Sequence, residues 1–359
     1  MAKSGQHGGN VIQMAQEHGL NPEQVIDFSA NINPLGMPHS VKQAIIEQLD
    51  CVEHYPDIDY LKLHQAIAAH HQLPVQQVIA GNGATELIFL WANHIKPKKA
   101  LLVEPSFAEY RRALARVDCE IVQFNLRESE QFALTPKLLD ALDASLDALF
   151  LCTPNNPTGL MPDHDLLLAI VARCHALDIA LFIDESFIDF MGDTPSLVAQ
   201  LADYPNLAIL RSLTKFYAMP GLRLGYLLSS NDALLGQMRE QREPWTINAL
   251  AALAGEVLFS DTQFVKNTLH WLEQEQTFVW QELSQLSGIT MYRPSANYLF
   301  FKHLEPNSQL QAQMMKHGIL IRSCANYPTL NQQFYRIAIK SRAANIQLIS
   351  ALKEVLHHG

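Results

Sequence analysis

The chain lacks the features that mark disulfide-rich, membrane-spanning and nucleic-acid-binding proteins. Its 359 residues include 5 cysteines, which are widely spaced and form no CxxC pair, so neither a disulfide framework nor a thiolate zinc site is expected. Apolar runs such as Leu166 to Ala172 are far too short to cross a bilayer. With 26 basic against 36 acidic residues, the net charge of -10 disfavours nucleic acid or an anionic membrane as the main partner. These absences predict a cytoplasmic protein with reduced thiols.

Several catalytic motifs are also missing. The 15 histidines form no HExxH spacing, and no metal site is predicted. Asp184 and Glu185 follow an apolar strand, as in phosphate-hydrolysing ATPases, but the chain has no GxxxxGKS or GxxxxGKT loop. The segment HGGN, His7 to Asn10, is similar to an esterase oxyanion motif, yet no GxSxG elbow accompanies it. GNGATE, Gly81 to Glu86, lacks the third glycine of the dinucleotide fingerprint, which disfavours a dehydrogenase.

What is present predicts a globular α/β protein. Apolar residues make up 48% and charged residues 17% of the chain, the balance of a soluble globular protein. From Val78 to Ser229, short apolar runs alternate with longer amphipathic ones, which predicts βαβ units and a mostly parallel sheet between helices. The expected strands are Leu101 to Val103, Ala148 to Cys152, Ala180 to Ile183, Leu207 to Leu210 and Leu224 to Leu228.

A second, smaller domain is expected after this region. Apolar residues recur at helical spacing between Asp261 and Leu286, which predicts a long helix. Beyond it, strands are expected within Ile289 to Phe301, Ile319 to Arg322 and Tyr335 to Ile339, which together indicate a small α+β domain. The sequence thus predicts three parts: an N-terminal arm over residues 1–45 that contributes to the small domain and the substrate site, a large domain over 46–250 and a small C-terminal domain over 251–359.

One lysine stands in a chemically suggestive setting. Lys215 follows the apolar run Leu207 to Leu210, so it lies at a strand end, where open α/β sheets bind their ligands. The surrounding segment, RSLTKFYAMPGLRLGY, adds hydroxyl groups and Arg223, which can hold a phosphate near the lysine. Lys215 is therefore a candidate Schiff-base nucleophile for an aldehyde cofactor.

Two glycine- and proline-rich segments also follow apolar strands. GNGATE, Gly81 to Glu86, opens a helical run, and the N–H groups of a helix start favour an anion, although a plain tight turn is equally compatible. TPNNPTG, Thr153 to Gly159, has a strongly restricted backbone. Asn155 or Asn156 can present an amide to a ligand oxygen, while an Asx-turn is the alternative for at least one of them.

Three charged residues in apolar strands leave two interpretations open. Asp184 either pairs with a cofactor nitrogen or caps a helix. Arg322, in LIRSCANY, and Arg336, in FYRIAI, each need an anion, which is either a protein carboxylate or a substrate carboxylate or phosphate.

Taken together in this order, Asn156, Asp184, Lys215 and Arg223 resemble the fold-type I pyridoxal-phosphate enzymes, the aspartate aminotransferase superfamily. Within it the chain is similar to the histidinol-phosphate aminotransferase branch, and more so to the threonine-phosphate decarboxylases of cobalamin (vitamin B12) synthesis. The resemblance covers essentially the whole chain, including HGGN, DFSANINPLGMP, TPNNPTGL, RSLTKFYAMPGLRLGYL and RSCANYP.

The resemblance implies a complete pyridoxal 5'-phosphate site. Lys215 would form the Schiff base, and Asp184 would pair with the pyridinium nitrogen so that the ring acts as an electron sink. Asn156 would bond the phenolic oxygen, and Tyr110 would stack on the ring. The cofactor phosphate would be held by Ala84, Thr85, Ser212, Thr214 and Arg223, together with Tyr55 of a neighbouring subunit, which implies a homodimer.

One position departs from the family pattern. Many aminotransferases carry a tyrosine three residues after the aspartate, and this chain has Phe187 there. The phenolic oxygen of the cofactor therefore loses one donor, and Asn156 would be left to supply it.

The resemblance also implies a reaction and a substrate. The expected lyase reaction is decarboxylation of L-threonine O-3-phosphate to (R)-1-amino-2-propanol O-2-phosphate, and a histidinol-phosphate-type aminotransferase is the alternative. The bond to the substrate's Cα that stands perpendicular to the cofactor ring is the one that breaks. The residues that orient the substrate therefore decide between decarboxylation and transamination. A non-catalytic binding protein that kept the fold is a third class. The implied substrate-binding residues are His7, Gly8, Asn31, Asn156, Arg322, Ser323 and Arg336.

Overall fold

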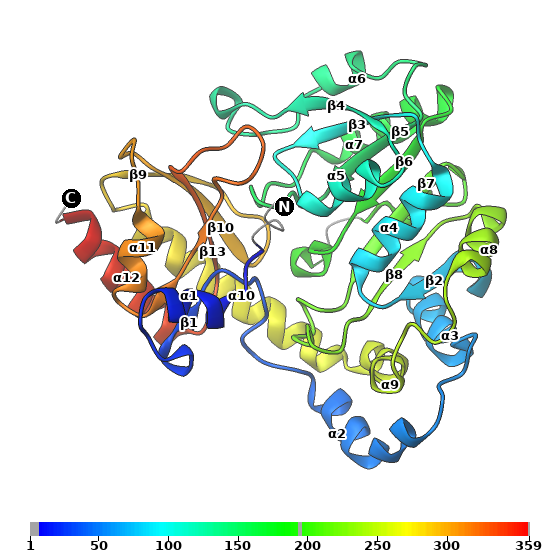
Figure 1. Cartoon of the computed structure of the whole chain (residues 1–359), viewed down its shortest axis with the longest axis horizontal. Coiled ribbons are helices and arrows are strands. Elements are labelled where there is room, and N and C mark those ends of the chain that lie inside the picture. Colours follow the sequence, from blue (N-terminus) through cyan, green and yellow to red (C-terminus); the bar gives the residue numbers. More distant parts are fainter. Residues whose placement is uncertain (1–6, 193–195, 358–359) are drawn as a thin grey trace.

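The computed structural model describes residues 7–192 and 196–357. Its largest element is a seven-stranded sheet with the order β2-β8-β7-β6-β5-β3-β4 (Figure 1). The five strands from β7 to β4 pair in parallel, whereas β8 runs antiparallel to both of its neighbours, β7 and the edge strand β2, which confirms the predicted mostly parallel sheet. The strands are β2 (Val78–Gly81), β3 (Lys99–Glu104), β4 (Glu120–Asn125), β5 (Ala148–Cys152), β6 (Ala180–Asp184), β7 (Leu207–Ser212) and β8 (Gly225–Leu228).

Both faces of this sheet are buried because its central strands are apolar on both sides. Successive side chains of a strand point to opposite faces, so Leu101 joins one hydrophobic cluster while Ala100 and Leu102 join the other. Helices α4 (Ala84–Ile95), α5 (Ala108–Ala115) and α8 (Asp232–Gln241) supply the second cluster. The opposite face is covered by helices that include α3 (Leu61–His71), α7 (His164–Ala176) and α9 (Ala249–Val257).

A smaller antiparallel sheet follows in the C-terminal part, with the order β12-β13-β10-β9. The N-terminal segment reaches this part, because β1 (Ile26–Asp27) pairs in parallel with β11 (Ile319–Leu320). Figure 1 shows α1 and β1, in dark blue, beside the orange and red C-terminal elements. The remaining elements are α1 (Val11–Glu17), α2 (His39–Glu47), α6 (Lys137–Asp140), β9 (Ile289–Tyr292), β10 (Tyr298–His303), α11 (Leu310–Met315), β12 (Arg322–Ser323), β13 (Phe334–Ala338) and α12 (Arg342–His357).

The long helix expected near Asp261 is α10 (Thr262–Leu283), of 22 residues. Asp261 caps it, because its side chain accepts a hydrogen bond from the backbone N–H of Phe264 at 3.0 Å. Across residues 7–192 and 196–357, no helix combines the length and the apolar character needed to cross a membrane.

Three strand expectations differ from the structure. The stretch Ile319 to Arg322 is divided between β11 and β12, which belong to different sheets. The stretch Ile289 to Phe301 contains two strands, β9 and β10, which pair with each other, because Pro294 and its neighbours form the connection and proline cannot donate to a ladder. Strand β4 was not expected at all. It is an edge strand with mixed burial, so its apolar pattern is weak. The domain boundaries after residues 45 and 250 stay a prediction.

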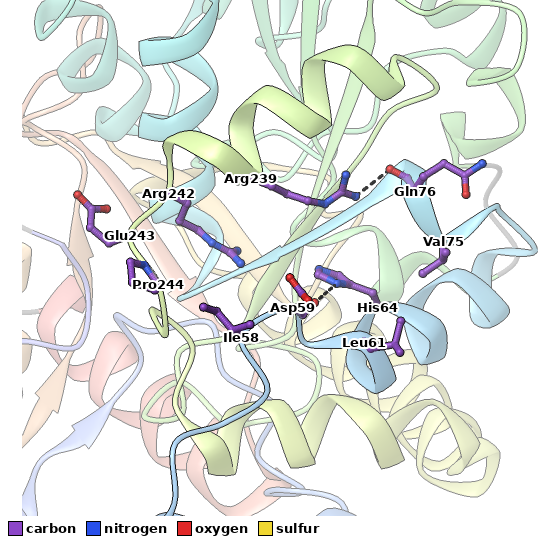
Figure 2. A pocket seen from close by; sticks show the side chains of 10 residues that line it. All are labelled: Ile58, Asp59, Leu61, His64, Val75, Gln76, Arg239, Arg242, Glu243 and Pro244. Atoms are coloured by element: carbon purple, nitrogen blue, oxygen red, sulfur yellow. Dashed lines mark hydrogen bonds between the residues drawn. The ribbon is translucent and has the colours of Figure 1, made fainter.

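The edge strand β2 is protected by two arginines and a histidine, which surround a cavity of about 390 Å³ (Figure 2). Arg239 donates to the carbonyls of Gln76 and Val78 at 2.8 and 2.7 Å, and Arg242 donates to the carbonyl of Ala80. The Nε2 atom of His64 accepts from the N–H of Ala80 at 3.0 Å. These contacts satisfy polar groups at the strand edge, so the cavity has a structural explanation.

Candidate active site

A cavity of about 750 Å³ lies where the large sheet, the N-terminal segment and the C-terminal sheet meet. Segments that follow strands β5, β6 and β7 reach it with Asn156, Phe187 and Lys215, the position at which open α/β sheets bind ligands. Ten residues predicted from the sequence line it: His7, Gly8, Asn31, Thr85, Asn156, Thr214, Lys215, Arg223, Arg322 and Arg336.

Lys215 is held by hydroxyl groups. Its Nζ atom donates to the Oγ of Ser212 at 3.1 Å, and that Oγ lies 2.9 Å from the Oγ1 of Thr214. Burial lowers the pKa of the lysine, and the charges of Arg223 and Arg336 lower it further, while Asp184 opposes this shift. A lowered pKa increases the neutral fraction of the amine, and only the neutral amine attacks an aldehyde.

The N-terminal segment supports the loop that carries Lys215. The backbone N–H of Asn33 donates to the carbonyl of Lys215 at 3.1 Å. The side-chain Nδ2 of Asn33 donates to the carbonyl of Phe216 at 2.8 Å and to the Oγ1 of Thr268 at 2.9 Å. Sequence reasoning assigned no role to Asn33, although it lies in the quoted segment DFSANINPLGMP.

Asp184 is the last residue of β6 and is buried. Its Oδ1 accepts from the backbone N–H of Ser186 at 2.8 Å, and its Oδ2 accepts from the hydroxyl of Tyr110 at 2.6 Å. The carboxylate is therefore held in one orientation near Lys215. This arrangement suits an acid that pairs with a cationic ring nitrogen, because its remaining lone pairs are free to accept another donor.

The position of Tyr110 differs from the predicted stacking role. Tyr110 is 1% exposed, its ring packs among Phe150 and Phe182, and its hydroxyl is bonded to Asp184. Phe107, three residues earlier, does line the cavity, and sequence reasoning missed it. Helix α5 begins just after Phe107, so this side chain stays at the sheet end while Tyr110 turns down onto the sheet.

A phosphate fits the region around the start of α4. Ala84 and Thr85 form its first turn, where backbone N–H groups and the helix dipole favour an anion. Gly83 has a φ of 81°, and a side chain there would collide with Arg223, since an added Cβ would lie 2.5 Å from its Nη2. Glycine at this position thus allows the guanidinium to approach the helix start. Among the described residues, Arg223 forms no salt bridge, so its charge is available to a ligand.

Two arginines face each other on the other side of the cavity. Arg322 of β12 pairs directly with Arg336 of β13, and both are 6% exposed. Neither forms a salt bridge within residues 7–192 and 196–357. Like charges opposite each other on neighbouring strands are unfavourable, and buried charges need a counterion. Of the two alternatives left open by the sequence, a carboxylate partner for these arginines is therefore not found among the described residues, and binding of a substrate anion stays a prediction.

Asn156 is oriented by its neighbours. Its Oδ1 accepts hydrogen bonds from Arg336 and, at 3.4 Å, from the hydroxyl of Tyr327. The Nδ2 group is thereby left to donate to a ligand. Nearby, both side-chain polar atoms of Asn31 and the Nε of Arg336 are buried without a hydrogen-bond partner among the described residues. Orphaned buried groups of this kind indicate that a polar ligand completes the site.

Two predicted residues lie elsewhere. Ser323 does not line the cavity, and its Oγ accepts from the N–H of Ala325 at 3.5 Å. Tyr55 is 80% exposed and packs on Trp245 with 4.8 Å between the ring centroids, so within one chain it does not reach the cavity. Phe187 lines the cavity, with its ring centroid 5.5 Å from the Nζ of Lys215, and it offers no hydroxyl.

Several cavity residues were missed by the sequence analysis. Asp27 is one of them: its Oδ1 accepts from the N–H and the Oγ of Ser29 at 2.8 and 2.6 Å, which shapes the segment leading to Asn31. Only the irregular composition of this segment signals its role. The other missed lining residues with polar or aromatic side chains include Glu109, Arg112 and Tyr327.

Comparisons with known proteins agree with this geometry. The family model described as aminotransferase class I and II matches residues 23–352. The chain is 53% identical over 350 residues to the threonine-phosphate decarboxylase of Salmonella typhimurium, covering 98% of this chain and 96% of the relative.

Solved structures share the fold. The histidinol-phosphate aminotransferase of Clostridium acetobutylicum matches with a TM-score of 0.87 and 31% identity, covering 92% of this chain and 99% of that one. The L-threonine-O-3-phosphate decarboxylase of Porphyromonas gingivalis matches with a TM-score of 0.83 and 23% identity, over 92% and 99% of the two chains. Because the family model spans most of the sequence, the chain belongs to the class I and II aminotransferase family.

Proposed function

We propose that this protein is a pyridoxal-phosphate-dependent decarboxylase that converts L-threonine O-3-phosphate to (R)-1-amino-2-propanol O-2-phosphate in cobalamin synthesis. The observation that carries the proposal is the facing pair Arg322 and Arg336, which has no acidic partner among the described residues. Such a pair suits a substrate with both a carboxylate and a phosphate. The 53% identity to a threonine-phosphate decarboxylase supports the same reaction.

The residues of the cavity fit the cofactor. When bound, pyridoxal 5'-phosphate supplies an electron sink for the charge that develops at the substrate's Cα. Lys215 would hold its aldehyde carbon, Asp184 its ring nitrogen and Asn156 its phenolic oxygen. The phosphate would lie against Thr85, Thr214 and Arg223 at the start of α4. Phe107, rather than Tyr110, would cover the ring.

The protein's own groups would choose the bond that breaks. Arg336 would bind the substrate carboxylate, with its position fixed by a hydrogen bond from Nη2 to the carbonyl of Ser29 at 2.8 Å. Arg322, His7 and the backbone of Gly8 would bind the substrate phosphate and so set the rotation about Cα. The amine of Lys215, whose pKa is lowered by burial, would carry the proton delivered to Cα after CO2 leaves.

A direct assay separates this proposal from a histidinol-phosphate-type aminotransferase. The purified protein, loaded with pyridoxal phosphate, is incubated with L-threonine O-3-phosphate alone, and with histidinol phosphate plus 2-oxoglutarate. We expect CO2 from the first mixture and no glutamate from the second. Glutamate formation from histidinol phosphate without CO2 release from phosphothreonine would overturn the proposal.

We also propose that the protein acts as a homodimer in the cytoplasm. An exposed apolar surface supports a dimer: the tilted rings of Tyr55 and Trp245 contact each other outside the cavity, and the neighbouring Ile58 and Leu61 are half-exposed. Tyr55 would then contribute to the cofactor site of the partner subunit. The five cysteines are all free thiols, as suits a reducing compartment. Light scattering on the eluting protein tests the dimer, and Tyr55→Asp together with Trp245→Asp is expected to yield monomers.

A further inference from the structure

Glu109 is a buried acid in the wall of a cavity suited to anions. It is 4% exposed and lines the cavity beside His7, Phe107 and Arg112. A carboxylate here requires an explanation, because unpaired it would repel a phosphorylated substrate. The proposed cofactor and substrate contacts of the cavity do not involve Glu109.

The contacts of Glu109 join the N-terminal segment to helix α5. Its Oε1 lies 2.8 Å from the Nε2 of His7. The Nη1 of Arg112 donates to both carboxylate oxygens, at 2.8 and 2.9 Å. The imidazole also packs on the ring of Phe107, with 5.6 Å between the centroids. The Nδ1 of His7 has no hydrogen-bond partner within residues 7–192 and 196–357.

A purely helical role does not account for these contacts. Glu109 lies in the first turn of α5 and pairs with Arg112 three residues on, and both features stabilise a helix. An exposed side chain would serve equally well for that purpose. The buried carboxylate instead contacts a residue 102 positions away in the sequence.

The contact decides which ring nitrogen of His7 is left for a ligand. A protonated imidazole has N–H donors on both ring nitrogens, and Nε2 is the one held by Glu109. With Nε2 on Glu109, the Nδ1–H is left to donate to a ligand. Protonated His7, Glu109 and Arg112 together carry one positive charge, so the group attracts an anion. Asp27, the other acid on the cavity wall, is bound to Ser29 and does not contact His7.

We propose that Glu109 is a positioning residue for the substrate phosphate: it holds the imidazole of His7 so that Nδ1–H binds a phosphate oxygen. The backbone beside His7 is already fixed, since the N–H of Gly9 donates to the Oγ of Ser29 at 2.8 Å. Glu109 fixes the side chain. This inference rests on the proposed function, because it requires a phosphorylated substrate.

A double-mutant cycle tests the inference. KM and kcat for L-threonine O-3-phosphate are measured by CO2 release for Glu109→Gln, for His7→Ala and for the double variant. Loss of one charge-assisted hydrogen bond should raise KM about tenfold in Glu109→Gln, with a smaller effect on kcat. In the His7→Ala background, Glu109→Gln should raise KM no further. The control Glu120→Gln makes the same change on the exposed edge strand β4 and should leave KM unchanged.

Two results would overturn the inference while leaving the proposed function intact. One is an active wild type whose KM does not respond to Glu109→Gln. The other is an increase in KM that persists fully in the His7→Ala background, since this would reveal a structural role independent of His7. A wild type that releases no CO2 overturns the proposed function and the inference together. If Glu109→Gln does not fold, Arg112→Gln can replace it in the double-mutant cycle with His7→Ala. Arg112→Gln alone should raise KM roughly threefold to tenfold, and it should cause no further increase in the His7→Ala background.

Discussion

Arg322 and Arg336 lie directly opposite each other on neighbouring antiparallel strands, and both are buried. Their guanidinium groups have no carboxylate partner in the part of the chain that the structure describes. The pair is therefore costly for the protein without a ligand and useful with an anionic one. Residues that are needed to bind a ligand often lower the stability of the ligand-free protein in this way.

The variant Arg322→Gln should separate the cost of the arginine pair to stability from its contribution to substrate binding. Without ligand it relieves the repulsion between the two guanidiniums, so we expect a Tm equal to or above that of the wild type. Because two charge-assisted hydrogen bonds to the substrate are lost, kcat/KM for L-threonine O-3-phosphate should fall roughly a hundredfold. Thermal unfolding and steady-state kinetics measure both. A lowered Tm would show that the structural contacts of Arg322, such as its hydrogen bond to the Oδ1 of Asn326 at 2.8 Å, outweigh the repulsion between the two guanidiniums.

The roles of Phe107 and Tyr110 can be distinguished by cofactor binding. Phe107→Ala removes the aromatic ring from the cavity wall, and we expect about tenfold weaker binding of pyridoxal phosphate, the value of a stacking contact. Tyr110→Phe keeps the buried ring and removes only the hydroxyl that donates to Asp184, so its affinity should change less. Absorbance titration of the cofactor-free protein measures both. The reverse order would restore the stacking role of Tyr110.

Gly8→Ala should displace the N-terminal segment. A Cβ at Gly8 would lie 2.1 Å from the carbonyl oxygen of Ser29, and backbone atoms cannot yield at that distance. We expect kcat/KM to fall by at least about tenfold, because His7 leaves the cavity. The control Gly236→Ala adds the same methyl group in helix α8, where nothing lies within 4 Å. It should leave activity unchanged and stabilise the fold by up to about 1 kcal/mol. Equal kinetics for the two variants would contradict the contact.

His64 should make the protein sensitive to acid. Burial, and then the charges of Arg239 and Arg242, lower the pKa of His64 from 6.5 to about 4. Between pH 6.5 and 4 the unfolded state therefore binds a proton that the folded state does not, and stability falls as the pH falls, by about 3 kcal/mol in all. Above pH 6.5 the residue contributes no pH dependence.

Urea unfolding at pH 7.5 and pH 4.5 measures this effect. His64→Gln should be less stable at both pH values, because it disturbs the hydrogen bonds at β2, but the difference between the two values should shrink. His54→Gln alters an exposed histidine and should keep the full difference. An undiminished pH dependence in His64→Gln would show that other groups cause it.

The parts of the site that follow strand ends could be predicted from the sequence. Lys215, Asn156 and Thr85 each follow a short apolar run, and parallel strands bring such positions to one edge of the sheet. The order of the strands and of the motifs that follow them was sufficient to predict these residues, since each motif is contained in one short segment.

Features that depend on the start of an element or on distant contacts could not be predicted. Phe107 and Tyr110 are three residues apart, and only the start of α5 decides which ring faces the cavity. The contact of Glu109 with His7 joins helix α5 to the N-terminal segment, and neither of these sequences indicates a contact with the other. The opposed arginines depend on the register of β12 and β13, which neither strand's sequence specifies alone.

The central claim is that the bond from Cα to the carboxylate breaks while the bond from Cα to hydrogen is kept. The most direct measurement uses L-threonine O-3-phosphate carrying deuterium at Cα, with mass analysis of the product. The account predicts 1-amino-2-propanol O-2-phosphate that retains the deuterium, together with one equivalent of CO2. Loss of the deuterium to solvent with formation of a 2-oxo acid, and no CO2, would contradict it.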